Sequence, residues 1–211
     1  MLDKLRFCLV TDIDKPFPEY ERFLKEVLEG GVQSVQLRAK SKNENDIYDL
    51  AYQLKKYLKP YQIPLIINDH IDIAVEIDAE GIHLGQSDKS PLLARKRLGP
   101  NKIIGLSIES ETELEKANAL TCLDYVAASA VFESKTKRNL KRIWGLEGLK
   151  KLSQASKYPV LAIGGIELTN VDAVLSHGAY GIALISALHE AANPKALAGA
   201  FLEKIKFQKE D

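Results

Sequence analysis

The chain alternates short apolar runs with longer segments in which apolar residues recur every three or four positions. Short runs rich in Val, Ile and Leu are typical of buried strands, and the longer pattern is typical of amphipathic helices. In one predicted helix, Ile47, Leu50, Ala51, Leu54 and Leu58 fall on a single face. The predicted strands are residues 7–10, 34–38, 64–67, 81–84, 103–106, 125–128, 160–163 and 181–185. The predicted helices are residues 19–28, 46–58, 71–77, 91–98, 111–120, 146–155, 171–177 and 194–205.

Strict alternation of strands and helices predicts a parallel sheet with crossover helices. Eight such units in 211 residues favour a closed (β/α)8 TIM barrel, and an open doubly wound sheet is the alternative. No linker or low-complexity segment divides the chain. We therefore predict a single barrel domain over residues 1–211.

Composition narrows the functional classes. The chain has 29 Lys and Arg against 29 Asp and Glu, so its net charge is zero with His counted as neutral. Without an excess of positive charge to neutralise phosphates, nucleic acid is not an expected partner. No apolar run approaches the roughly 18 residues of a membrane-spanning helix, and the N-terminus does not resemble a signal peptide. Cys8 and Cys122 lie in or beside apolar runs, which predicts buried free thiols and fits a reducing cytoplasm.

The active site of a (β/α)8 barrel lies at the carboxyl ends of its strands. Nearly every predicted strand is followed by polar residues or glycine: Thr11 and Asp12, Gln36, Arg38 and Lys40, Asn68 and Asp69, Gln86 and Asp88, Ser107, Ser134, Thr136 and Lys137, Gly164 and Gly165, and Ser186. Polar loops are common on their own. Their convergence at one end of the barrel indicates an enzyme.

A basic row follows the second predicted strand. Strand residues alternate between faces, so Gln36 and Arg38 share one face, and Lys40 continues it. The intervening Val35 and Leu37 are then expected to face the helices. A guanidinium and an ammonium at a barrel mouth suit a phosphate group. The alternative is an internal salt bridge to an acid.

Two carboxylates follow neighbouring strands. Asp69, preceded by Asn68, comes after the third predicted strand, and Asp88 comes after the fourth. With no His or Cys cluster nearby, this pair suggests Mg²⁺, which is usually held by one or two carboxylates, waters and substrate phosphates. The alternative is a pair of solvated loop acids or helix caps.

Further anion-binding groups follow the sixth, seventh and eighth strands. The loop after the sixth strand contains two hydroxyls and three cations, namely Ser134, Lys135, Thr136, Lys137 and Arg138. Gly164–Gly165 and Ser186 follow the next two strands, where this fold commonly binds phosphate. The alternatives are a solvated basic loop and a tight turn that needs positive φ. We predict two anion sites: one with Arg38, Lys40, Lys137 and a metal, the other with Gly165, Ser186 and the hydroxyls of Ser134 and Thr136.

These residues belong to a recognisable pattern. The segments that carry it are GGVQSVQLRAK, PLIINDHIDIA, GIHLGQSD, IIGLS, VFESKTK, GLEGL, PVLAIGGI and GIALISA. AIGGI is common to phosphate-binding barrels, whereas QLR-x-K, the IND and HLGQ-x-D pair, and S-x-T-K are together much more specific. On these motifs, the chain resembles the thiamine phosphate synthase family over nearly its whole length.

The resemblance implies a transferase of thiamine biosynthesis. Such an enzyme joins hydroxymethylpyrimidine diphosphate to a thiazole phosphate and releases diphosphate, by a dissociative route through a pyrimidine carbocation. The residues implied for the pyrimidine diphosphate are Gln36, Arg38, Lys40, Asn68, Ser107 and Lys137, of which Arg38, Lys40, Ser107 and Lys137 are also assigned to catalysis. Asp69 and Asp88 are implied as Mg²⁺ ligands. The residues implied for the thiazole phosphate are Ser134, Thr136, Gly165, Ile185 and Ser186. The expected partners are these two small molecules, and a homodimer is left open.

One position departs from the family pattern. Ser129–Ala130 stand where the family usually has Gly-Pro, before Val131 and Phe132. Thiazole tautomerases, which are relatives on the same fold, carry a catalytic His just before that apolar-Phe pair, and this chain has Ala130. A tautomerase and a non-catalytic phosphate-binding barrel are the alternatives to the synthase.

The remaining chemistry-bearing side chains are expected to be structural. We expect His83 to be a packed or hydrogen-bonded strand residue. Trp144 is expected to pack at the start of the sixth helix. The other three histidines, His70, His177 and His189, are expected to be surface or cap residues.

Overall fold

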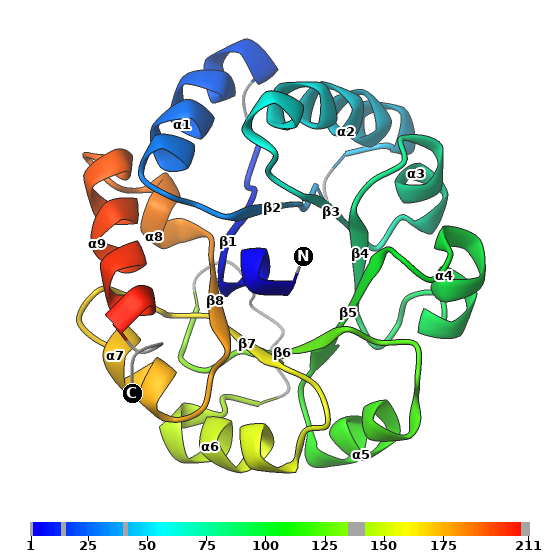
Figure 1. Cartoon of the computed structure of the whole chain (residues 1–211), viewed down its shortest axis with the longest axis vertical. Helices are drawn as coiled ribbons and strands as arrows, with labels where there is room; N and C mark the ends of the chain where they lie inside the picture. The colour runs from blue at the N-terminus through cyan, green and yellow to red at the C-terminus, as the bar shows by residue number, and fades with distance from the viewer. Residues whose placement is uncertain (1, 14–15, 40–41, 135–141, 208–211) are drawn as a thin grey trace.

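The computed structural model describes residues 2–13, 16–39, 42–134 and 142–207. Eight parallel strands close into a barrel in chain order, with β8 paired to β1, and the helices surround it (Figure 1). The strands are β1 (Phe7–Val10), β2 (Ser34–Leu37), β3 (Leu65–Asn68), β4 (Gly81–Leu84), β5 (Ile103–Ile108), β6 (Tyr125–Ser129), β7 (Val160–Ile163) and β8 (Gly181–Leu184). The closed ring confirms the predicted (β/α)8 barrel and excludes the open sheet.

The helices also follow the predicted order. They are α1 (Phe17–Glu29), α2 (Glu44–Leu58), α3 (Ile71–Glu76), α4 (Pro91–Leu98), α5 (Glu111–Ala119), α6 (Gly145–Ala155), α7 (Val171–Ser176), α8 (Ser186–His189) and α9 (Pro194–Phe207). Two 3-10 helices, η1 (Leu2–Arg6) and η2 (Lys59–Tyr61), and the four-residue α8 were not predicted.

Local chemistry sets where several helices begin. The Asn43 side chain accepts a hydrogen bond from the backbone N–H of Asp46, so α2 begins at residue 44 and not at the predicted 46. Ser110 caps α5 in the same way through the N–H of Glu113. These caps satisfy N–H groups that would otherwise lack a partner in the first helical turn.

The core has an outer and an inner part. Val35 and Leu37 are buried in the outer part between barrel and helices, which confirms their predicted direction. The inner part includes Ile66, Tyr125 and Leu161, and Leu5 of η1 packs against it. In Figure 1, η1 lies across the end of the barrel that faces the viewer. The barrel floor is therefore filled with side chains, and a cavity can open only at the other end.

Two further expectations can be compared with the structure. Cys8 and Cys122 are both free and buried, as predicted. Within the described part of the chain, no helix is long and apolar enough to cross a membrane.

Candidate active site

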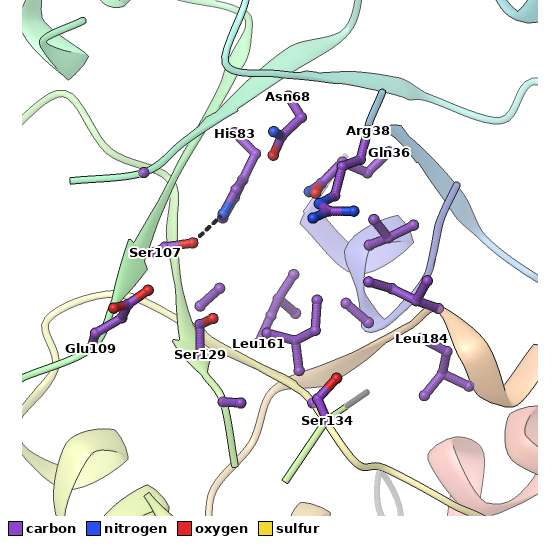
Figure 2. A pocket seen from close by; sticks show the side chains of 18 of the residues that line it. Gln36, Arg38, Asn68, His83, Ser107, Glu109, Ser129, Ser134, Leu161 and Leu184 are labelled. Atoms are coloured by element: carbon purple, nitrogen blue, oxygen red, sulfur yellow. Dashed lines mark hydrogen bonds between the residues drawn. The ribbon is translucent and has the colours of Figure 1, made fainter. Parts of the chain in front are cut away.

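A cavity of about 330 Å³ opens among the carboxyl ends of the strands (Figure 2). Its size suits a small-molecule ligand. Every predicted site residue that the structure describes lines it, namely Gln36, Arg38, Asn68, Asp69, Asp88, Ser107, Ser134, Gly165, Ile185 and Ser186. Lys40, Thr136 and Lys137 lie outside the described residues.

Two hydrogen bonds with Thr11 hold the backbone of Arg38 at the mouth of the cavity. Its N–H donates to Oγ1 of the buried Thr11 at 3.0 Å, and the Thr11 hydroxyl donates to the Arg38 carbonyl oxygen at 3.3 Å. Gln36 lies one step deeper on the same face of β2 and is buried. Among the described residues, no acid forms an ion pair with Arg38, so the alternative of an internal salt bridge is not observed there. The guanidinium is oriented into the cavity (Figure 2).

The two predicted metal ligands line the same cavity but are held differently. Asp69 adopts a φ of 68°, and its N–H donates to the His83 carbonyl oxygen at 2.9 Å. Asp88 accepts a hydrogen bond from the Gly85 N–H at 2.6 Å through Oδ2. A left-handed conformation is uncommon for a residue other than glycine, although Asp and Asn tolerate it best. The backbone of Asp69 and the carboxylate of Asp88 are therefore fixed by backbone hydrogen bonds.

The donor set fits Mg²⁺. No group of three or more His, Cys, Asp or Glu side chains able to hold a metal occurs among the described residues. A closed protein cage of the kind that binds structural zinc is therefore not formed by this part of the chain. Two carboxylates beside an arginine side chain match the way Mg²⁺ binds, with waters and substrate phosphates as its other ligands.

The Gly164–Gly165 turn needs glycine for two reasons. Both residues have positive φ, 99° and 63°. A Cβ at Gly164 would lie 2.4 Å from the Ala130 Cβ, and one at Gly165 would lie 2.5 Å from the Glu133 carbonyl oxygen. The tight-turn alternative is thus correct, and the turn also lines the cavity. This close approach sets the segment that leads to Ser134 directly against the turn.

His189 corrects one expectation, because its ring packs against Tyr20 and Phe23 and has hydrogen-bond partners at both nitrogens. Its Nδ1 lies 2.8 Å from the Ile185 carbonyl oxygen, and its Nε2 lies 3.2 Å from the Asp12 backbone nitrogen and 2.9 Å from the Tyr20 hydroxyl. A carbonyl only accepts and a backbone N–H only donates, so the neutral ring carries its proton on Nδ1. The ring also packs against Phe23, with centroids 4.6 Å apart. These contacts fix the Ile185–Ser186 segment to the loop after β1.

The other side chains that were expected to be structural lie where the sequence predicts, but one of them also lines the cavity. His83 is buried and hydrogen-bonded as predicted, through Nε2 to the Ser107 hydroxyl at 2.8 Å, but it also lines the cavity. Trp144 is buried at the start of α6, and its indole N–H donates to the Ile108 carbonyl oxygen at 3.2 Å. His70 directly precedes α3 and His177 directly follows α7, as the cap prediction requires.

Sequence reasoning missed several polar residues of the cavity wall. They are Glu109, Tyr125 and Ser129, together with His83, which was expected to be only a structural residue. Strand alternation was the available signal, because His83 lies two residues after Gly81 in β4, Glu109 lies two residues after Ser107 of β5, and Tyr125 and Ser129 fall on one face of β6. Figure 2 shows Glu109 and Ser129 at one side of the cavity, with Ser107 next to them.

A closed (β/α)8 barrel with a basic group, two carboxylates and a glycine turn around one cavity at the carboxyl ends of its strands is the arrangement of a TIM-barrel enzyme. A family model described as thiamine monophosphate synthase matches residues 7–188, and the chain belongs to this family. A thiamine-phosphate synthase of Vibrio campbellii is 42% identical over 195 residues, which cover 92% of this chain and 95% of that relative. One of Methanobrevibacter smithii is 38% identical and covers 96% of each chain. The solved thiamine phosphate pyrophosphorylase from Pyrococcus furiosus superposes with a TM-score of 0.86 at 32% identity over 98% of both chains.

Proposed function

We propose that this protein is a thiamine-phosphate synthase, a transferase that joins hydroxymethylpyrimidine diphosphate to thiazole phosphate and releases diphosphate. The observation that carries the proposal is the distribution of groups around one cavity in a member of this family. Arg38, Asp69 and Asp88 follow the adjacent strands β2, β3 and β4. Gly165 and Ser186 follow the adjacent strands β7 and β8. Two anionic substrates can therefore meet from opposite parts of the barrel.

The half of the cavity formed by β2 to β5 would bind the pyrimidine diphosphate. Arg38 offers a planar fork of donors that matches phosphate oxygens. The polar side chains deeper in the barrel can hydrogen-bond the pyrimidine ring. The proposed ligands here are Gln36, Arg38, Asn68 and Ser107, together with Lys40 and Lys137.

The half formed by β6 to β8 would bind the thiazole phosphate. Gly165 presents backbone without a side chain, and Asn170 Nδ2 donates to its carbonyl oxygen at 3.0 Å, which holds the turn in place. Ser134 and Ser186 line the same cavity and add hydroxyl groups. The proposed ligands here are Ser134, Thr136, Gly165, Ile185 and Ser186.

Asp69 and Asp88 would hold Mg²⁺, which when bound neutralises negative charge on the departing diphosphate. Arg38 would add a fixed positive charge on the same side of the cavity, and the Gly85 N–H would keep the Asp88 carboxylate in its orientation. Preorganised charge of this kind stabilises a leaving group without reorganisation during the reaction.

The chemistry itself requires little of the side chains. The bond between the pyrimidine methylene carbon and the diphosphate oxygen breaks, and the thiazole nitrogen forms the new bond to that carbon. No proton has to be moved to form this bond. The protein would act mainly by stabilising the diphosphate and by holding the nitrogen in line with the carbon.

The structure around Ala130 favours the synthase over the tautomerase. Ala130 is buried, and its Cβ lies against Gly164 where the two loops meet. The side chain at the position of the tautomerase histidine is thus a packing methyl group with no acid–base chemistry. We also propose a cytoplasmic location, which the two buried free thiols support.

Product formation from both substrates with Mg²⁺ tests the proposal. We expect thiamine phosphate to form with the wild type, and excess EDTA to abolish its formation. Asp69→Asn and Asp88→Asn should each lower activity about tenfold or more at limiting Mg²⁺, with partial recovery at high Mg²⁺ if the other carboxylate still holds the ion. Asp46→Asn, an exposed acid at the start of α2, is the matched control and should behave as wild type.

Three other outcomes would contradict parts of the proposal. A shift of the thiazole double bond without condensation would identify a tautomerase. Binding of both ligands without turnover would identify a non-catalytic barrel. Full activity in excess EDTA would exclude the metal role of Asp69 and Asp88 and leave the synthase assignment standing.

A further inference from the structure

Tyr125 is a buried polar residue between the floor of the barrel and the cavity. The strand register places Asn68 beside His83, His83 beside Gly105, and Gly105 beside Tyr125. A Cβ at Gly105 would lie 2.1 Å from Cζ of Tyr125. The absence of a side chain at Gly105 thus lets the phenol ring extend across β5 toward β4, where it stacks on the His83 ring with centroids 5.5 Å apart.

A chain of two hydrogen bonds connects this phenol to the cavity. The Tyr125 hydroxyl lies 2.8 Å from Nδ1 of His83, and Nε2 of His83 lies 2.8 Å from the Ser107 hydroxyl (Figure 2 shows the second bond). Tyr125 and His83 are both buried, at 2% and 6% exposure. The Ser107 backbone is held separately, because Gln86 Nε2 donates to its carbonyl oxygen at 2.7 Å. Ser107 therefore has a fixed backbone and a hydroxyl whose hydrogen can be directed by His83.

The acid–base chemistry of the partners determines which atom donates in each of these two hydrogen bonds. A phenol is a stronger acid than a neutral imidazole N–H, and imidazole nitrogen is a better acceptor than phenol oxygen. Burial raises the pKa of Tyr125 well above its ordinary value, so the phenol keeps its hydrogen. That hydrogen goes to Nδ1 of His83, which lies 2.8 Å from the phenol oxygen.

The direction of the Tyr125–His83 hydrogen bond determines whether the Ser107 hydroxyl can donate to a ligand. If Nδ1 accepts from Tyr125, the neutral imidazole carries its proton on Nε2 and donates it to the Ser107 oxygen. The Ser107 hydrogen is then free to point into the cavity. In the opposite tautomer, Nε2 would accept the hydrogen of the Ser107 hydroxyl, and Ser107 could not donate a hydrogen bond to a ligand.

We propose that Tyr125 is a positioning residue that fixes the Nε2–H tautomer of His83 and thereby keeps the Ser107 hydroxyl as a hydrogen-bond donor to the pyrimidine diphosphate. The inference rests on the proposed function, because it takes this substrate as the ligand of Ser107. Tyr125 lies deep in the cavity wall, and in this role it acts through His83.

Tyr125→Phe, which keeps the ring and removes the hydroxyl, is the first test. We expect kcat/KM for the pyrimidine diphosphate to fall about tenfold, the effect of one neutral hydrogen bond, while KM for the thiazole phosphate stays within about twofold. Tyr180→Phe is the matched control, because the Tyr180 hydroxyl donates to Oδ1 of Asp3 at 3.0 Å, near the closed end of the barrel. It should leave both constants unchanged. An equal loss for the two substrates would show a general structural effect and overturn the inference.

A double-mutant cycle with Ser107→Ala tests whether the effect passes through Ser107. In the Ser107→Ala background, Tyr125→Phe should change kcat/KM by at most about twofold, because the group that it positions is already absent. Full additivity would overturn the inference. If Tyr125→Phe does not fold, His83→Asn interrupts the same chain and should show the same selectivity and the same dependence on Ser107.

The tautomer of His83 provides a readout that needs no substrate. The chain has four histidines, so comparison with His83→Asn assigns the imidazole ¹⁵N signals. We expect a protonated Nε2 and a bare Nδ1 in the wild type, with the Nδ1–H form populated in Tyr125→Phe. A wild-type Nδ1–H ring would overturn the inference whatever the kinetics. Wild-type protein without synthase activity would instead overturn the proposed function, and synthase activity that is indifferent to Ser107→Ala would overturn this inference alone.

Discussion

Arg38 and Ser186 follow strands on either side of β1, and they are the side chains most suited to separate the two substrates. Arg38→Ala should lower kcat/KM for the pyrimidine diphosphate roughly ten- to a hundredfold, because a charge-assisted hydrogen bond is lost. Ser186→Ala should mainly raise KM for the thiazole phosphate, by about tenfold or less, because a neutral bond is lost. Steady-state kinetics with each substrate varied in turn measures both.

Arg97→Ala is the matched control for the arginine. Arg97 pairs with Asp72 on the outside of the barrel at 2.8 Å and should leave both constants unchanged. If Arg38→Ala weakened the use of both substrates equally, the division into two anion sites would be wrong. If Ser186→Ala impaired only the pyrimidine diphosphate, the two halves of the cavity would have to be exchanged.

The residues that could be predicted from the sequence are those whose direction depends on a single strand or turn. Alternation in β2 is enough to place Gln36 and Arg38 on the inner face, and both line the cavity. The role of His83 could not be predicted, because its partners Ser107 and Tyr125 are 24 and 42 positions away. Those contacts depend on the register between three strands, and a single sequence does not specify that register.

Elements were predictable where a hydrophobic period extends over several turns. α2 and α9 have such a period, and both form where expected apart from their ends. η1 has only five residues, three of them charged, and therefore shows no period. Its formation depends on packing against the floor of the barrel, where Leu5 becomes 1% exposed. α8 is shorter still, and the contacts of His189 with the β1 loop hold it in place.

Removal of the Leu5 side chain tests whether η1 stabilises the barrel. Leu5→Ala leaves a cavity against Ile66, Ile103 and Leu161, so the free energy of unfolding should fall by about 2–5 kcal/mol. Leu92→Ala, the same change at a side chain 56% exposed on α4, should alter it by about 0.5 kcal/mol or less. Urea unfolding measures both. Equal effects of the two changes would mean that η1 frays from the barrel in solution.

At the scale of the whole molecule, ion pairs connect the outer segments around the barrel. Glu29 of α1 pairs with Lys195 of α9 at 2.7 Å. Asp72 of α3 pairs with Lys89 at 2.7 Å and with Arg97 of α4. Hydrogen bonds from these cations hold the pKa of Glu29 and Asp72 below their ordinary values of 4.5 and 3.8. Such exposed pairs are individually weak and are screened by salt.

The linkage between these carboxyl groups and folding gives a pH dependence with a definite sign. Because their pKa values are lower in the folded protein, the unfolded chain takes up protons first as the pH falls through 4.5 and 3.8, and stability is lost in that direction. At alkaline pH, burial raises the pKa of Cys8 from 9.0 to about 11, so the unfolded chain loses its proton first and stability falls as the pH rises above 9.0.

Urea unfolding across the pH range should therefore show a plateau from about pH 5 to about pH 8 with a decline on either side. Asp72→Asn should flatten the acid side, high salt should reduce it, and Cys8→Ala should flatten only the alkaline side. An unfolding free energy that stays constant as the pH falls below 3.8, or that rises, would show that these pairs do not contribute to the stability of the barrel.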